Sequence, residues 1–222
     1  MKNKFKTFLL IVLAGIMMIT LAGCGEKEES DSKKKDKEEN KTSQNPVEDN
    51  TEKIDLGRWD NNVYTNDYLG MKITLPEGWT PASDEKLAEY MHIGEDLLKD
   101  EGKYISEVAK QTSIYYASAT EDMTGNGIIV MSEKSAGAAG VEDYIKALKS
   151  QLTSVTQMSY KVVNEGTAEF AGKTWSTVTL SESVYGVTQR YYVCEKDEAF
   201  VGIILTSISG ESTLDKIEEF FK

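Results

Sequence analysis

Short runs rich in β-branched and aromatic residues recur along the chain after residue 58, and many are separated by glycine or by clustered polar residues. Runs of this kind predict strands, and the turn residues between them predict tight connections. The predicted strands cover residues 63–64, 71–75, 112–119, 127–133, 158–164, 174–181, 187–195 and 199–206. Turns are expected at Gly172, at Gly186 and at Lys196-Asp197-Glu198.

Three other segments carry apolar residues three or four positions apart, the spacing of a helix with one buried face. The first is capped by Ser83, runs past Leu98 and continues toward Val108. The second covers residues 141–155 and the third covers 212–221. We expect the third helix to bury the two phenylalanines near its end.

Connections this short force neighbouring strands to pair antiparallel, because parallel neighbours need crossovers of a dozen or more residues. Helices with a single apolar stripe must cover the faces of the sheet. The sequence therefore predicts an α+β fold, a three-layer α/β/α sandwich with a mainly antiparallel central sheet.

The chain begins with lysines at positions 2, 4 and 6, followed by an uncharged apolar run and then by Leu21-Ala22-Gly23-Cys24. The apolar run is shorter than the roughly 20 residues that span a bilayer, which favours a cleaved export signal. The last four residues resemble the lipobox of bacterial lipoproteins. This resemblance implies lipid on Cys24 and a mature chain that starts there. The alternative is an uncleaved membrane helix over residues 7–25.

Residues 1–23 are thus predicted to be a signal peptide, 24–57 a lipidated cysteine with a charged tether, and 58–222 a single globular domain. The segment 26–53 contains ten acidic and seven basic residues and almost nothing apolar to bury. Both interpretations of the N-terminus place everything after residue 25 outside the cytoplasm. The expected location is the bacterial cell membrane, with the domain lipid-anchored and facing outward.

The part from Asp55 onward carries 15 basic and 27 acidic residues. Binding to nucleic acid depends largely on cationic contacts with phosphate, so nucleic acid is not an expected partner. Cys194 lies in a strand-like run far in sequence from His92, the chain's one histidine. A reactive thiol would need an electropositive neighbour, so Cys194 is interpreted as a structural residue and His92 as a surface or core-edge residue.

Two motifs resemble ligand sites without having the right surroundings. Residues 122–133 match the oxygen spacing of a calcium-binding EF-hand loop, but β-type runs rather than helices flank them, so we predict a hairpin. Residues 166–174 end in Gly-Lys-Thr, yet the spacing differs from a phosphate-binding loop and a strand follows. No catalytic, metal-binding or cofactor-binding residue is predicted.

Leu75-Pro76-Glu77-Gly78-Trp79, Ala171-Gly172-Lys173-Thr174-Trp175 and the closing Phe220-Phe221-Lys222 resemble the PsbP-like family over nearly all of residues 60–222. That family includes the extrinsic photosystem II subunit, a Ran-binding nuclear import factor and many bacterial lipoproteins. The resemblance implies a binding or assembly role without catalysis.

Two function classes follow from the sequence. The first is a lipid-anchored, non-catalytic binding or accessory module that acts on an envelope protein partner. The alternative is a carboxylate-dependent hydrolase acting on a cell-wall or surface polymer, because the many acidic residues can include a catalytic pair. A cleft with two facing carboxylates would favour the enzyme, and a filled sandwich would favour the binding module.

Overall fold

The structure, a computed structural model, describes residues 54–134 and 137–222. Cys24, the predicted signal peptide and nearly all of the predicted tether lie outside these residues. Their lipidation, cleavage and location therefore stay predictions. No helix in the described ranges is both long enough and apolar enough to cross a membrane.

Ten strands and five helical segments make up the described chain. The strands are β1 (Arg58–Asp60), β2 (Val63–Asn66), β3 (Met71–Thr74), β4 (Trp79–Pro81), β5 (Ser113–Glu121), β6 (Gly127–Lys134), β7 (Tyr160–Phe170), β8 (Lys173–Glu182), β9 (Thr188–Lys196) and β10 (Ala199–Ser207). The helices are α2 (Asp84–Tyr90), the 3₁₀ helix η1 (Glu95–Lys99), α3 (Glu101–Lys110), α4 (Val141–Ser154) and α5 (Glu211–Glu218).

Seven strands form one sheet in the order β4-β5-β6-β10-β9-β8-β7, and every neighbouring pair is antiparallel. β1, β2 and β3 form a separate antiparallel sheet. The hairpin between β5 and β6 is confirmed, as are the tight turns before β8, before β9 and before β10. The predicted α+β fold with a mainly antiparallel central sheet is also confirmed.

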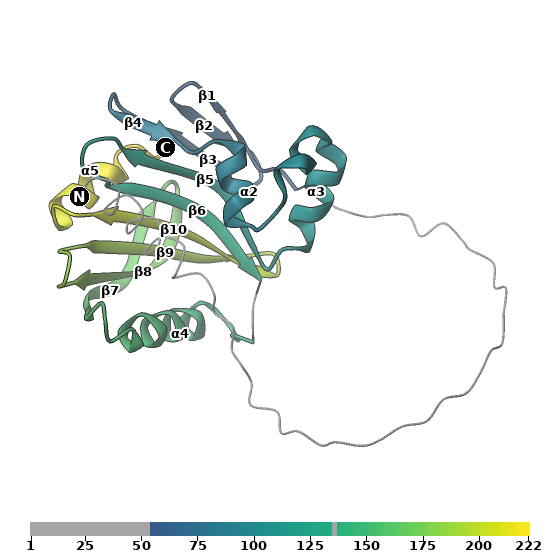
Figure 1. Ribbon diagram of the computed structural model, residues 1–222. Coiled ribbons are helices and arrows are strands. Elements are labelled where there is room, and N and C mark those ends of the chain that lie inside the picture. The colour runs from purple at the N-terminus through teal and green to yellow at the C-terminus, as the bar shows by residue number, and fades with distance from the viewer. Residues whose placement is uncertain (1–53, 135–136) are drawn as a thin grey trace, which may run out of the picture.

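Helices lie against both faces of the large sheet. On one face, Tyr90 of α2 contacts the Tyr115 ring, and Tyr144 of α4 lies against Phe200 with 4.6 Å between ring centroids. On the other face, Arg190 of β9 binds Asp215 and Glu218 of α5. The small sheet shares this second face with α5, since Tyr68 approaches Tyr116 there. One outer layer is therefore helical, and the other combines α5 with three strands (Figure 1).

The first predicted helix is the clearest error of the sequence analysis. Ser83 does cap it, accepting a hydrogen bond from the Lys86 N–H, but α2 ends at Tyr90. His92 then takes a φ of 56° and Gly94 is extended, so the apolar stripe is divided among α2, η1 and α3. Positive φ at a non-glycine residue cannot continue a right-handed helix.

The last predicted helix is too long by about one turn. α5 ends at Glu218, and Phe221 forms an isolated antiparallel bridge with Ile73 of β3. The phenylalanine is nonetheless buried, as predicted, because its ring packs against Phe170 with centroids 4.8 Å apart. The end of the chain thus joins the small sheet to the large one.

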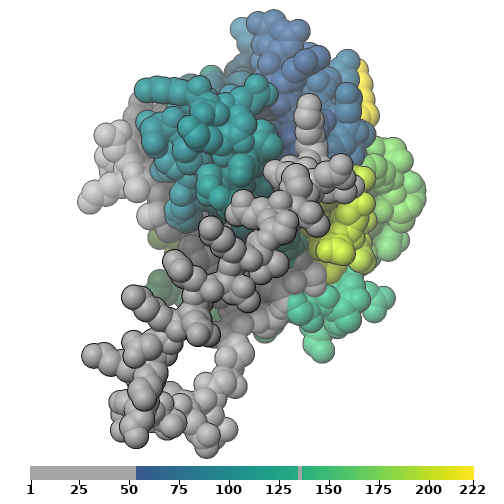
Figure 2. All heavy atoms as spheres, turned by 90° about the vertical axis from the view of Figure 1, so that its right-hand side faces the viewer, coloured from purple at the N-terminus to yellow at the C-terminus, as the bar shows by residue number. Residues whose placement is uncertain are grey.

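The chain enters the domain beside the loop between β2 and β3. Ile54 and Leu56 pack against the core, slightly before the predicted boundary at residue 58. Burial disfavours ionisation of Asp55, but the N–H groups of Gly57, Tyr68 and Asp67 donate to its carboxylate and lower its pKa overall. Figure 2 looks onto this end of the molecule, where the yellow-green β9–β10 turn lies between the blue small sheet and the green start of α4.

Candidate binding surface

Exposed apolar side chains gather at one end of the large sheet. Seven large hydrophobic side chains in the described residues are exposed, and five of them surround the start of β7. Their exposed fractions are 39% for Val155, 41% for Val162, 47% for Val163, 53% for Val184 and 47% for Tyr185. We call these five residues the apolar edge patch. Contiguous exposed apolar surface on a soluble domain is typical of an interaction site.

The strand register brings these residues together. Tyr160 at the start of β7 pairs with Glu182 at the end of β8, so the β8–β9 turn lies beside the first residues of β7. Val155 follows the last residue of α4, in the short connection from α4 to β7. In Figure 1 the end of α4 and the start of β7 lie together at the left of the molecule.

A β-bulge accounts for the two adjacent exposed valines. Val162 pairs with Leu180 and Asn164 pairs with Thr179, so Val163 is an extra residue with no partner in β8. A bulge places two residues of one strand opposite one residue of the other and redirects a side chain. Val162 and Val163 can therefore both contribute to the same exposed surface, where regular alternation would have turned one of them away.

The carboxylate of Glu182 holds the neighbouring turn in place. Glu182 is only 2% exposed, and it accepts hydrogen bonds from the N–H of Val184 and from that of Tyr185, the latter at 2.8 Å. Hydrogen bonds to a charged acceptor are stronger than neutral ones. The Val184 and Tyr185 side chains are thus presented on a fixed backbone, and this lowers the entropy that binding would cost.

The patch borders an open sheet edge. β7 is the terminal strand of the large sheet, spans 11 residues, and eight of these residues are exposed. A long edge strand presents unpaired backbone N–H and C=O groups that another strand can bind. The apolar edge patch therefore lies next to an open backbone edge.

Few charged side chains lie at the patch, and acidic side chains lie farther along β7. Between Val155 and Asn164, and across the β8–β9 turn from Ser183 to Val187, Lys161 is the one ionised side chain. Farther along, Glu165 pairs with Lys149 of α4, and Glu169 accepts a hydrogen bond from the Thr174 hydroxyl. The surface is thus apolar at one end of β7 and acidic at the other.

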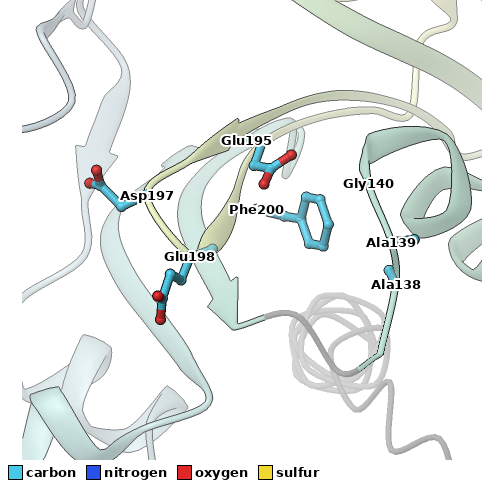
Figure 3. Close-up of a pocket in the computed structure, with 8 residues that line it drawn as sticks. Ala138, Ala139, Gly140, Glu195, Asp197, Glu198 and Phe200 are labelled. Atoms are coloured by element: carbon cyan, nitrogen blue, oxygen red, sulfur yellow. The ribbon is translucent and has the colours of Figure 1, made fainter.

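A shallow depression of about 240 Å³ lies at the opposite end of the large sheet. It is lined by residues 138–140 before α4 and by residues around the β9–β10 turn, including Glu195, Glu198 and Phe200. In Figure 3 the Glu195 side chain lies beside the Phe200 ring, whereas Asp197 points away from it.

The carboxyl group nearest this depression with a shifted pKa is Glu133. Burial raises the pKa of Glu133, although a hydrogen bond from the Tyr144 hydroxyl at 2.8 Å opposes the shift. Glu133 and Glu195 both pair with Phe200, from strands on either side of β10, which places their backbones about two strand spacings, or about 10 Å, apart. Tyr144 packs on Phe200 and bonds Glu133, so this carboxylate lies under a ring and does not face open solvent.

The oxygens of the calcium-like loop are dispersed in the structure. The Asp122 carboxylate accepts from the Thr80 hydroxyl, and Thr124 and Asn126 both donate to Glu121. Glu133 lies within β6 and bonds Tyr144. Among the described residues, no group of three or more histidine, cysteine, aspartate or glutamate side chains is arranged to hold a metal ion.

The other residues considered in the sequence have structural positions. His92 is exposed just after α2, and Lys173 in the Gly-Lys-Thr motif donates to the Leu69 carbonyl from a hairpin. Cys194 is half-buried on β9, and burial raises the pKa of its thiol despite Lys173 and Lys196 nearby. This environment does not activate a thiol.

Comparison with known proteins gave matches only at the level of structure. No family model matches the chain, and neither does any curated sequence. The solution structure of cyanobacterial PsbP (CyanoP) from Synechocystis sp. PCC 6803 matches with a TM-score of 0.45 and 11% identity, over 72% of this chain and 90% of that one.

A second match is the crystal structure of the Ran-binding protein Mog1p from Saccharomyces cerevisiae, with a TM-score of 0.38 and 11% identity, over 69% of this chain and 89% of that one. The chain is similar in structure to PsbP and Mog1. Both kinds of protein are members of the PsbP-like family that the sequence analysis named. Similarity at this level bears on the fold alone, so the function has to be argued from the residues of this chain.

Sequence reasoning missed the apolar edge patch, although two signals for it are present. The Val162-Val163 pair breaks strand alternation, and the β8–β9 turn contains Val184-Tyr185 where turns usually carry polar residues. Neither signal reveals exposure, because exposure depends on β7 being the edge strand of the sheet.

Proposed function

We propose that this protein is a non-catalytic binding module, anchored by lipid on Cys24 to the outer face of a bacterial cell membrane, which docks an envelope protein through the apolar edge patch. The observation that carries this proposal is the gathering, at the start of β7 and the turn beside it, of five of the seven large hydrophobic side chains that are exposed among the described residues.

The composition of the patch supports a protein partner. Tyrosine and aliphatic side chains with little charge nearby are typical of the centre of a protein interface, where aromatic anchors carry much of the binding energy. The Glu182 hydrogen bonds hold Val184 and Tyr185 in position before binding. A protein surface with complementary apolar side chains is therefore the ligand class that fits.

The proposed anchor makes a modest affinity sufficient. A lipidated chain and a membrane-bound partner diffuse in the same plane, and a flexible tether of about 30 residues has a root-mean-square span of about 30 Å. Confinement at this range raises the effective concentration of partner for the domain. An enzyme acting on a soluble substrate would gain less from the same anchor.

The hydrolase alternative requires a catalytic site, and the depression by the β9–β10 turn is the candidate for it. Glu195 and Glu198 line it, but Glu133, the nearest carboxyl group with a raised pKa, is bonded to Tyr144 and buried. A glycosidase needs an acid and a second carboxylate flanking one substrate bond. If the depression is such a site, the purified chain degrades a wall polymer and Glu195→Gln abolishes the activity.

The proposal is tested by crosslinking in intact cells, followed by purification of the full-length protein and mass spectrometry. We expect recurrent capture of one membrane protein complex by the wild type. Val163→Lys with Val184→Lys should reduce capture at least about tenfold, because charge introduced into an apolar interface must be desolvated. Met123→Lys is the matched control, since Met123 is 92% exposed on a different turn.

The anchor is tested separately by metabolic labelling with a palmitate analogue. Label should be present on the wild type and absent from Cys24→Ala. Equal labelling of both would refute the anchor. Equal capture by the patch variant and by Met123→Lys would refute the patch as the docking surface.

A further inference from the structure

β7 has a regular stretch beyond its bulge. From Asn164 to Phe170 every residue pairs with β8 in unbroken antiparallel register, and β8 is the one strand beside β7 in the described sheet. Backbone groups on the far side of such a strand are open to a further strand. Seven residues at about 3.3 Å each give an open edge about 23 Å long.

We infer that this edge receives an extended, basic segment of the docked protein, which adds an eighth strand to the large sheet beside β7. The inference rests on the proposed function and specifies the form in which the partner occupies the same surface. Main-chain hydrogen bonds to β7 would supply affinity, and side chains of the added strand would supply selectivity.

The acidic residues of β7 determine the charge of the segment. Glu165 pairs with Val178 and binds Lys149 of α4, so it lies on the α4 side of the sheet. Glu169 lies four residues along and shares that side, because side chains alternate. Lysine or arginine on the same side of an added strand would lie next to both carboxylates, and opposite charges across a strand pair are stabilising.

The opposite face of β7 leaves room for side chains of the added strand. Gly166 and Ala168 alternate with the two glutamates, and a Cβ placed at Gly166 would meet nothing within 4 Å. Beyond Asn164, the apolar edge patch can contact apolar residues at one end of the segment. The expected ligand is therefore basic along one side and β-branched at the end that reaches the patch.

A second copy of this chain is a poor occupant of the same edge. If two copies paired antiparallel over residues 164–170, the two-fold axis would pass through Thr167. Glu165 of each copy would then lie directly opposite Glu169 of the other, on the same side of the sheet. Like charges in directly opposed positions destabilise strand pairing.

The test uses the mature chain with Cys24→Ala and a short synthetic peptide in which valine and lysine alternate. Residue-resolved amide exchange is measured by NMR with and without the peptide. We expect binding that slows exchange within residues 164–170. The same peptide with alternate backbone nitrogens methylated should not bind, because it lacks the N–H groups that face the edge.

Replacing the lysines of the peptide by glutamate should weaken binding roughly tenfold or more, because two favourable cross-strand charge pairs become repulsive. Glu165→Gln with Glu169→Gln should abolish that difference between the peptides while amide exchange in β8 and β9 is unchanged.

Several results would overturn strand addition. One is no binding of the lysine peptide, and another is equal binding of the methylated peptide. A third is a shift of NMR signals confined to the valine methyl groups of the patch, without slower amide exchange in β7. Such a shift would indicate that the peptide binds the patch without adding a strand. Formation of a dimer through β7 without peptide would assign the edge to a second copy. None of these results affects partner capture in cells, which tests the proposed function separately.

Discussion

At one edge of the large sheet, β4 offers three residues and ends at Pro81, whereas at the other edge β7 runs for 11 residues, eight of them exposed. Proline has no N–H to donate to a further strand. The Trp79 ring of β4 packs edge-on against Phe220, with centroids 5.2 Å apart. The Thr80 hydroxyl donates a hydrogen bond to the Asp122 carboxylate in the β5–β6 turn.

This contrast shows two ways of managing a sheet edge. β4 is protected by its short length, its proline and the chain terminus packed against it. β7 is protected by a bulge and by like charges, devices that hinder pairing with an identical edge. Charges of one sign still permit pairing with a segment of the opposite sign. The protection of β7 therefore excludes an identical edge but admits a basic segment, whereas the protection of β4 excludes both.

The largest expected difference between the two regions is in stability. Phe221→Ala should lower the free energy of unfolding by about 3 kcal/mol, because it leaves a cavity beside Phe170 and loosens the terminus that packs near β4. Val163→Ala should change it by less than about 0.5 kcal/mol, since the side chain is 47% exposed. Urea unfolding of residues 25–222 measures both. Comparable losses would contradict the assignment of Phe221 to the core and of Val163 to the exposed surface.

The next prediction compares the carboxylate-braced turns near the two edges. Glu182→Gln should cost about 2 kcal/mol, because one acceptor oxygen is replaced by an amide donor facing the N–H groups of Val184 and Tyr185. Glu121→Gln, in the partly buried β5–β6 turn beside β4, should cost about 1 kcal/mol or less. Thermal unfolding measures the difference. A larger loss at Glu121 would show that the β8–β9 turn is not the more rigidly held one.

The third prediction removes the charge protection of β7. Glu165→Thr with Glu169→Thr should make residues 25–222 self-associate at concentrations of about 100 μM, because pairing of two β7 strands would no longer oppose like charges. Thr80→Val on β4 is the control and should leave the sedimentation coefficient unchanged. A double variant that stays monomeric would mean that the bulge alone protects the edge.

The smallest expected effect lies in the covered middle of the sheet. The pKa of Glu133 is raised in the folded state by burial, so its ionisation is more favourable in the unfolded chain and stability falls as the pH rises above the ordinary glutamate pKa of 4.5. Glu133→Gln should therefore raise the free energy of unfolding near pH 7 and have no such effect below about pH 4, where the carboxyl group is protonated in both states. Urea titrations at both pH values test this. A gain that persisted at low pH would exclude ionisation as its cause.

Local elements were predictable where one pattern dominated. The 14-residue helix α4 and the hairpins of the large sheet follow from apolar spacing and from turn residues such as Gly172 and Gly186. The break between α2 and α3 was not predicted, because Met91 and Leu97 continue a helical stripe whichever way the backbone turns at His92. The small sheet was missed as a separate layer, since strand spacing says nothing about which sheet a strand joins.

The apolar edge patch depends on a property that local sequence does not encode. Val162 belongs to β7, which is last in the order β4-β5-β6-β10-β9-β8-β7, and Val184 lies in the turn beside it. A further strand paired with β7 would cover part of this surface. Strand order arises from contacts between distant parts of the chain, and sequence periodicity carries no record of it.

The position of Asp55 has a mechanical consequence. Its carboxylate fastens the entering chain to the β2–β3 loop, where the Tyr68 hydroxyl bonds Asp197 in the β9–β10 turn. The β8–β9 turn, with Val184 and Tyr185, lies at the other end of β9, whose nine residues extend about 30 Å. In the arrangement proposed above, the membrane is attached at one end and the partner at the other, so tension between them would run along the strands. A force along the strands loads many inter-strand hydrogen bonds at the same time, whereas a force across the strands breaks them one after another. The domain would therefore resist the first kind of force better than the second.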